Sequence, residues 1–232
     1  MLLELNNVSK KYKSNFALKE VTFGLEQGKV LGLLGPNGSG KTTMMKLIQG
    51  YLKPNKGTIK IDGKKPSAKT KAMVSYLPDT FFIPDYFTID EAMETYEDFF
   101  KDFNREKAID LLYFMNLKPE MKVSTLSKGM TEKLHLALIL SRDAKLYILD
   151  EPISGVDLVT RDKILGAIVN NISEGSSMII STHLVDEIEG VIDEVAFINE
   201  GQIILSGEAD ALREQKGKQI ADIYRDLFKE EA

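Results

Sequence analysis

The sequence has 232 residues, of which 43% are hydrophobic and 28% are charged, and its formal net charge at pH 7 is −5. This composition is ordinary for a globular protein, and the slight negative charge argues against the general electrostatic attraction on which nucleic-acid binders depend. The chain has no cysteine, which excludes disulfides and thiolate metal sites.

The sequence shows no segment suited to crossing a membrane. No apolar run approaches the roughly 20 residues that span a bilayer. Residues 1–4 lack the basic region and the long apolar core of a signal peptide. We therefore expect a cytoplasmic protein with no direct membrane insertion, for which any membrane role comes through a partner.

The first third of the chain has the pattern of an α/β protein. Apolar residues alternate near residues 3–8 and 21–25, which predicts two half-buried strands. A continuous apolar run at 29–34 is typical of a buried parallel strand, and a helix is predicted at 41–49. Further strands are expected at 58–61 and 73–77, and Asp62-Gly63 between them is a strong hairpin signal.

The pattern then changes to helices and returns to strands. Helices are predicted at 89–100, 105–115 and 127–140, and strands at 145–149, 177–181, 194–199 and 202–205. We predict one domain over 1–232, in which 1–78 and 145–207 form the catalytic α/β core. Residues 79–144 form an inserted helical subdomain, and 208–232 form a charged helical tail packed on the core.

A complete phosphate-binding loop follows the buried strand and opens the first helix. The segment Gly35-Pro36-Asn37-Gly38-Ser39-Gly40-Lys41-Thr42 matches the pattern G-x-x-x-x-G-K-[ST]. The glycines let the backbone curl with its N–H groups around a β-phosphate, and the helix N-terminus adds its dipole. Lys41 is expected to reach the β- and γ-phosphates, and the Thr42 hydroxyl to bind Mg²⁺. The predicted ATP-binding residues are Gly35, Pro36, Asn37, Gly38, Ser39, Gly40, Lys41, Thr42 and Thr43.

The strand predicted at 145–149 leads into two acidic residues, Asp150 and Glu151. A carboxylate at the end of this strand would lie beside the phosphate loop, where Asp150 can hold Mg²⁺ through water. Glu151, one residue further, could polarise the attacking water as a general base. The two motifs together predict an NTPase.

The segment Leu126-Ser127-Lys128-Gly129-Met130 opens a predicted helix. With the phosphate loop and the acidic strand, it makes the whole chain resemble the nucleotide-binding subunits of ABC transporters, whose signature reads Leu-Ser-Gly-Gly-Gln. The resemblance implies a P-loop NTPase (RecA-like) core, an antiparallel β subdomain and an inserted α-helical subdomain. It also implies that Ser127, Lys128, Gly129 and Met130 cap the ATP held by a second subunit. Lys128 and Met130 depart from the family pattern.

Further residues acquire expected roles from the resemblance. His183, after an apolar strand, corresponds to the switch histidine that contacts the γ-phosphate. Asp157 lies in a segment that crosses the dimer interface, although it could equally cap the following helix. Tyr12 stands where the family stacks an aromatic ring on adenine. Asp79 replaces the usual glutamine, and we expect it to contact Mg²⁺ or its water.

Two features of the predicted helical insertion have alternative interpretations. Phe81, Phe82, Ile83, Tyr86 and Phe87 either pack in the core or line the groove that, in this family, receives a coupling helix of the membrane subunit. His135, among apolar residues of a predicted helix, is interpreted as a packing or surface residue.

The resemblance implies an ATPase with ATP and Mg²⁺ as cofactors. Its implied partners are a second cassette, identical or similar, and an integral-membrane permease that holds it on the inner face of the cell membrane. We expect it to power transport, in the direction of export from the cell. Two alternatives stand beside this interpretation. A soluble ABC ATPase of translation or DNA repair typically has two cassettes or long coiled coils, and a non-enzymatic regulator would lack Glu151 or His183.

Overall fold

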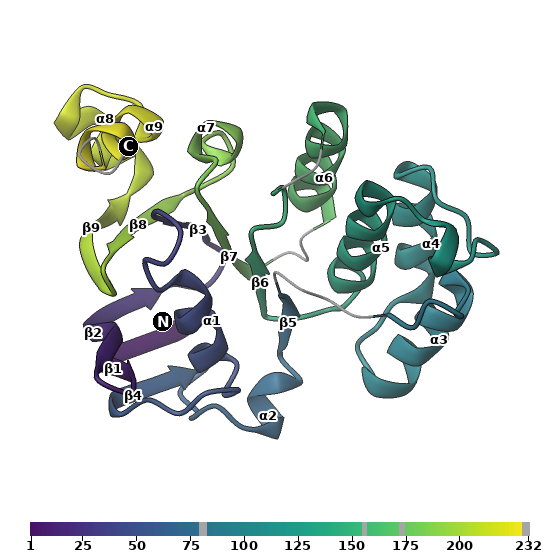
Figure 1. The fold of residues 1–232 in the computed structure, drawn as a ribbon, viewed down its shortest axis with the longest axis horizontal. Coiled ribbons are helices and arrows are strands. Elements are labelled where there is room, and N and C mark those ends of the chain that lie inside the picture. The colour runs from purple at the N-terminus through teal and green to yellow at the C-terminus, as the bar shows by residue number, and fades with distance from the viewer. Residues whose placement is uncertain (79–82, 155–156, 172–174, 229–232) are drawn as a thin grey trace.

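The structure of the protein is a computed structural model that describes residues 1–78, 83–154, 157–171 and 175–228. It contains two sheets: the larger runs through the middle of the molecule, and the smaller lies at the left in Figure 1. The smaller sheet is antiparallel, in the order β2 (Asn15–Leu25), β1 (Leu3–Tyr12), β4 (Lys56–Ile61). It confirms the strands predicted near 3–8, 21–25 and 58–61, each of which starts earlier or ends later than its apolar alternation indicates.

The larger sheet carries the buried strands. Its order is β5 (Val74–Leu77), β6 (Leu146–Asp150), β7 (Ser177–Thr182), β3 (Val30–Leu34), β8 (Glu194–Asn199), β9 (Gln202–Glu208). All neighbouring strands are parallel except β9, which runs antiparallel to β8. The middle strands are buried on both faces, which explains their unbroken apolar runs.

Each face of the larger sheet has its own hydrophobic core. Because side chains alternate along a strand, Leu31 and Leu33 face the smaller sheet and helix α1 (Lys41–Ile48). On the opposite face, Met178 and Ile180 belong to a second core that extends into the helices. Helix α1 therefore lies between the two sheets, and residues 35–40 connect it to the end of β3 (Figure 1).

The helical part contains α3 (Ile89–Phe99), α4 (Arg105–Phe114), a short 3-10 helix (Val123–Thr125) and α5 (Lys128–Leu140). Local capping explains where they begin. The Thr88 hydroxyl accepts a hydrogen bond from Glu91 N–H, and the Glu91 carboxylate accepts one from Thr88 N–H, a reciprocal capping box. The Ser127 hydroxyl accepts from Met130 N–H, 3.3 Å away, and caps α5. All three predicted long helices are confirmed.

The remaining helices of the described part of the chain are α2 (Ala68–Lys71), α6 (Leu158–Asn171), α7 (Val185–Ile188), α8 (Ala209–Lys216) and α9 (Ile220–Leu227). The charged tail predicted after residue 208 is helical, as α8 and α9. Both helices contribute buried residues to the core on the helical face of the larger sheet. The division of the chain into core, insertion and tail stays a prediction.

The hairpin predicted at Asp62-Gly63 is only partly formed. Both residues have positive φ, 50° and 69°, as a type I′ turn requires, and Ile61 pairs with Lys64 across it. No second strand follows, because Pro66 lacks an N–H donor and Ser67 then starts the capping box of α2. The turn signal and the strand predicted at 73–77 are both confirmed, but that strand is β5 of the larger sheet and does not pair with β4.

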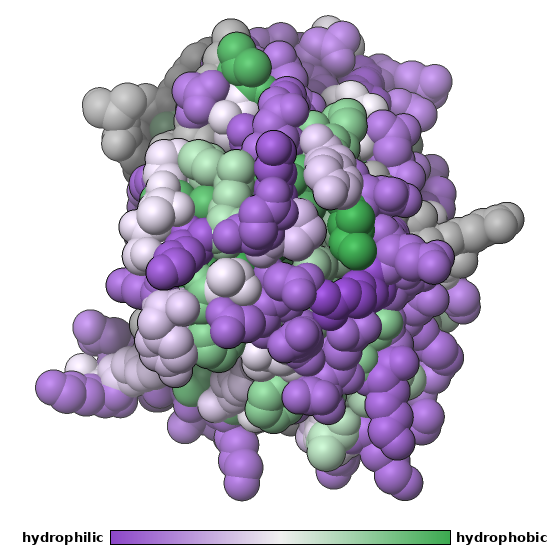
Figure 2. Space-filling model, turned by 90° about the vertical axis from the view of Figure 1, so that its right-hand side faces the viewer, coloured by the Kyte–Doolittle hydropathy of each residue, from purple (hydrophilic) through white to green (hydrophobic). Residues whose placement is uncertain are grey.

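The surface over the helical part is mostly hydrophilic, with small apolar areas between charged side chains (Figure 2). Among the described residues, no helix combines the length and the apolar character that crossing a membrane requires.

Candidate functional site

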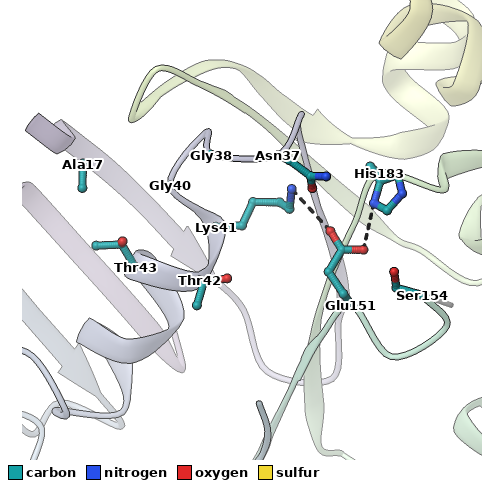
Figure 3. A pocket seen from close by; sticks show the side chains of 10 residues that line it. All are labelled: Ala17, Asn37, Gly38, Gly40, Lys41, Thr42, Thr43, Glu151, Ser154 and His183. Atoms are coloured by element: carbon teal, nitrogen blue, oxygen red, sulfur yellow. Dashed lines mark hydrogen bonds and ion pairs between the residues drawn. The ribbon is translucent and has the colours of Figure 1, made fainter. Parts of the chain in front are cut away.

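A cavity of about 420 Å³ opens at the carboxyl end of β3, beside the start of α1 (Figure 3). Its walls come from segments far apart in the sequence. The residues that line it are Ala17, Asn37, Gly38, Gly40, Lys41, Thr42, Thr43, Glu151, Ser154 and His183. The carboxyl edge of a parallel sheet, next to a helix N-terminus, is where open α/β folds bind phosphorylated ligands.

The loop between β3 and α1 depends on glycine at two positions. Gly40 has φ 113°, and a Cβ there would lie 2.6 Å from the Ala17 carbonyl oxygen. A Cβ on Gly35 would lie 2.2 Å from the Ile198 carbonyl oxygen. Any other residue would push the loop away from β2 and β8, so the close packing itself requires the glycines of the motif.

Lys41 carries a positive charge into a nearly closed environment. Its side chain is 6% exposed, and its Nζ donates hydrogen bonds to the carbonyl oxygens of Gly35 (2.7 Å) and Pro36 (3.1 Å). It also lies 3.4 Å from Oε1 of Glu151. A buried cation needs such acceptors, and here the two carbonyl oxygens hold the ammonium group against residues 35 and 36 of the loop.

The two acidic residues at the end of β6 have different surroundings. Asp150 is 1% exposed, and its Oδ1 accepts a 2.6 Å hydrogen bond from the Ser181 hydroxyl. Glu151 has a φ of 52°, in the left-handed region that a non-glycine residue rarely adopts. Its N–H donates to the Ser181 carbonyl oxygen at 3.0 Å. This sharp turn directs the Glu151 side chain into the cavity (Figure 3).

His183 follows β7 and faces Glu151 across the cavity. Its Nδ1 lies 3.0 Å from Oε2 of Glu151. The Thr182 hydroxyl accepts a 2.9 Å hydrogen bond from Leu184 N–H, which turns the chain immediately after the histidine. Glu151 thus contacts a lysine through one oxygen and a histidine through the other.

The oxygen donors here fit Mg²⁺. Magnesium usually takes one or two protein oxygens and completes its octahedron with water and substrate phosphate. The Thr42 hydroxyl, which lines the cavity, and the buried Asp150 carboxylate, next in sequence to the lining residue Glu151, would form such a set. Among the described residues there is no group of three or more His, Cys, Asp or Glu that could hold a metal without a ligand's help.

Comparison with known proteins agrees with this geometry. Residues 18–154 match the family model described as ABC transporter. The chain belongs to the ABC transporter family. Its fold is that of the family's ATPase cassettes, and its reaction is the hydrolysis of ATP.

Named relatives and solved structures extend over almost the whole chain. The chain is 32% identical to "ABC transporter ATP-binding protein YtrB" of Bacillus subtilis, over 92% of this chain and 74% of that protein. It is 33% identical to "Nod factor export ATP-binding protein I" of Sinorhizobium fredii, over 96% of this chain and 67% of that protein. A solved "ATP binding subunit of ABC transporter" superposes with a TM-score of 0.88 at 26% identity, covering 98% and 99% of the two chains.

The cassette brings eight of the predicted site residues into the lining of one cavity, namely Asn37, Gly38, Gly40, Lys41, Thr42, Thr43, Glu151 and His183, and leaves others outside it. Ser127–Met130 begin α5 and do not line the cavity. Asp157 caps α6, since its Oδ1 accepts from Thr160 N–H at 3.0 Å. Hydrogen bonds from the Thr160 hydroxyl and N–H lower the pKa of Asp157. Tyr12 is 48% exposed at the end of β1 and is not part of the cavity lining.

Predicted residues 79, 81 and 82 lie outside the described residues. Of the other aromatic-cluster residues, Ile83 is buried in the core and Tyr86 is 78% exposed. His135 is buried in α5, as one of the two interpretations proposed, and desolvation lowers its pKa to about 4.

Ala17 in β2 is the cavity residue that sequence reasoning missed. A small apolar residue in a strand has no chemical signature, and only the meeting of the two sheets brings it to the loop. Ser154, three residues before Asp157, also lines the cavity, and no role in ATP binding was predicted for it.

Proposed function

We propose that this cassette hydrolyses Mg-ATP between two copies of itself, or between itself and a similar cassette, and thereby powers export through a separate membrane permease. One observation carries the proposal. The cavity gathers Lys41, Glu151 and His183, but no residue of the signature segment 127–130 lines it. In Figure 1 the start of α5 lies well away from α1, so the site needs a second chain to supply its other half.

Within one subunit, the loop N–H groups and Lys41 bind the phosphates. Lys41 exchanges its contacts with two carbonyl oxygens and Glu151 for phosphate oxygens, which releases one oxygen of Glu151. Glu151 then accepts a proton from the attacking water, while His183 keeps the carboxylate oriented through the 3.0 Å contact. Mg²⁺, held by Thr42 and Asp150 and reached by Asp79, would neutralise charge on the phosphates.

The signature segment is suited to act on the neighbouring subunit. Ser127 and Lys128 are exposed at the start of α5, where the helix dipole favours an anion. A Cβ on Gly129 would meet nothing closer than Thr160, 3.9 Å away, so its backbone is open. Thr160 also bonds to Asp157, which brings the expected interface residue beside the signature. Tyr12 completes the nucleotide site by stacking on adenine.

A second cavity supports coupling to a permease. This groove, of about 550 Å³, lies between α2, β5 and α3 and is mostly apolar. Its side chains include Tyr51 and Phe99, which are 59% and 77% exposed, and Lys71 lies over the Tyr51 ring at 4.4 Å. Exposed aromatic rings around a groove are typical of a site for a partner helix. The groove reaches Pro78, next to Asp79.

The direction of transport is proposed from the relatives. The name of one of them, "Nod factor export ATP-binding protein I", describes export. The permease would also hold this cassette at the inner face of the membrane.

The central experiment is the substitution Glu151→Gln, which keeps the shape of the side chain and removes the base. We expect the variant to bind Mg-ATP and to elute as a dimer in size-exclusion chromatography with light scattering, because ATP is held and not hydrolysed. As a matched control, Glu151→Gln combined with Lys41→Ala should stay monomeric. A Glu151→Gln protein that is monomeric at saturating Mg-ATP would refute the proposed dimer mechanism.

The permease proposal has its own test. Phe99→Ser should reduce co-purification of the permease encoded with this chain and its transport activity, because an aromatic anchor of the groove is lost. Tyr113→Ser, at a ring that is 57% exposed on α4 outside the groove, is the control. Equal co-purification by both variants would argue against the groove as the docking site.

A further inference from the structure

The short helix α7 begins two residues after His183, and every acidic side chain from 186 to 189 contacts an arginine of another element. Asp186 accepts from Arg225 of α9 through both carboxylate oxygens, at 2.6 and 2.8 Å. Glu187 pairs with Arg161 of α6 at 3.1 Å. Since a four-residue helix is not stable alone, its position must be set by these neighbours.

The least exposed of these three acidic side chains is Glu189, which is 18% exposed. Its Oε1 accepts a 2.6 Å hydrogen bond from Ile220 N–H, the first residue of α9, and lies 3.6 Å from Nε of Arg213. Arg213 also donates from Nη2 to the Glu189 carbonyl oxygen at 2.8 Å. Glu189 therefore joins the end of α7 to α8 and α9 together.

Apolar packing strengthens the same connection. Val185 and Ile188 of α7 are 3% and 0% exposed, and Ile220 and Ile223 of α9 are 0% and 4% exposed, all within one core cluster. Fully burying one such side chain contributes about 2 kcal/mol, whereas an exposed ion pair contributes about 1 kcal/mol or less. We infer that the apolar packing holds α7 against α9, and that the arginine contacts set the orientation of α7 relative to α8 and α9.

We propose that the helix pair α8–α9 is a positioning device for His183. It holds α7 so that the imidazole stays in hydrogen-bonding contact with Glu151, and Arg161 supports α7 from the side of the Asp157 loop. Arg213 and Arg225 are positioning residues, because they act on the histidine through α7 and touch no nucleotide-binding residue. The inference rests on the proposed role of His183 in hydrolysis.

The reason why such support affects the rate is geometric. A hydrogen bond weakens steeply as its length and angle depart from about 3 Å and linearity. A displacement of about 1 Å in a catalytic group can cost up to about a hundredfold in rate. Because the phosphate loop is held by its own close packing against Ala17 of β2 and Ile198 of β8, a shift of α7 should affect the chemical step and leave ATP binding intact.

The experiment measures ATPase kinetics of the full chain with Arg213→Met and Arg225→Met combined. We expect kcat to fall about tenfold and KM for ATP to stay within about twofold of its original value. Arg213→Lys with Arg225→Lys, which keeps the charges, should recover part of the loss. The control is Lys218→Met, which removes an ion pair to Asp226 inside the tail that does not reach α7.

A double-mutant cycle with His183→Ala separates the possible outcomes. If the tail acts through His183, the arginine changes have no further effect on kcat in the His183→Ala protein. An equal loss in both backgrounds, a similar loss in Lys218→Met, or an unchanged kcat in the folded double variant would overturn the positioning inference. If His183→Ala alone leaves kcat unchanged, the proposed role of His183 fails, and the inference fails with it.

Discussion

His135 gives the signature helix α5 a defined sensitivity to acid. The side chain is 5% exposed, and desolvation lowers the pKa of His135 from 6.5 to about 4. The folded state therefore binds the proton less readily than the unfolded state, so the stability that the neutral histidine provides is complete above pH 6.5. That stability decreases as the pH falls below 6.5, and it is lost completely once the pH is below about 4. Linkage between these two pKa values gives a loss of about 2 kcal/mol at pH 5.

The assay compares the original protein with His135→Gln, a neutral side chain that does not titrate. Thermal unfolding of both proteins is measured at pH 7.5 and pH 5. Other titrating groups are the same in the two proteins, so their contribution cancels in the difference in Tm. The difference in Tm between the two proteins should move by about 4–8 °C in favour of the variant on acidification. If the difference in Tm is the same at both pH values, the proposed burial of a neutral His135 is refuted.

Two substitutions test the site itself. Gly35→Ala places a Cβ within 2.2 Å of the Ile198 carbonyl oxygen, so calorimetry should find ATP affinity reduced at least about tenfold. The control Gly190→Ala, with no atom within 4 Å of the new Cβ, should bind ATP normally. Equal ATP affinities of the Gly35→Ala and Gly190→Ala proteins would contradict the packing argument. Ser181→Ala removes the 2.6 Å hydrogen bond to Asp150, and we expect the Mg²⁺ concentration for half-maximal ATPase activity to rise about tenfold. An unchanged Mg²⁺ dependence would show that Asp150 does not need this partner.

Much of the fold followed from local patterns. The loop at 35–42 was recognised because only its glycine spacing satisfies the backbone turn around a phosphate. Helices α3 and α5 were predicted from the helical periodicity of their apolar residues, and the structure shows that Thr88 and Ser127 cap them through local hydrogen bonds. The buried strands were found because burial on both faces leaves no polar alternation.

Contacts between distant segments could not be predicted in this way. Nothing in the sequence near Ala17 indicates that its carbonyl oxygen lies against Gly40, and only the pairing of the sheets creates that contact. The groove beside Phe99 likewise needs three elements to meet. The short helix α7 was missed because the contacts that hold it come from distant segments, such as Arg225, which is 39 residues from Asp186. The roles assigned to Tyr12 and Asp79 stay predictions.

The positive φ of Glu151 implies that the thermal stability of this cassette and its rate of ATP hydrolysis place opposite demands on this position. A non-glycine residue in the left-handed region costs about 1–2 kcal/mol, and here that cost falls on the carboxylate proposed to activate water. Glycine adopts the same φ freely, so a mutant library selected only for heat resistance should favour Glu151→Gly, an inactive but sturdier protein. Selection for function keeps the glutamate, and the two buried cores of the larger sheet supply the stability that allows it.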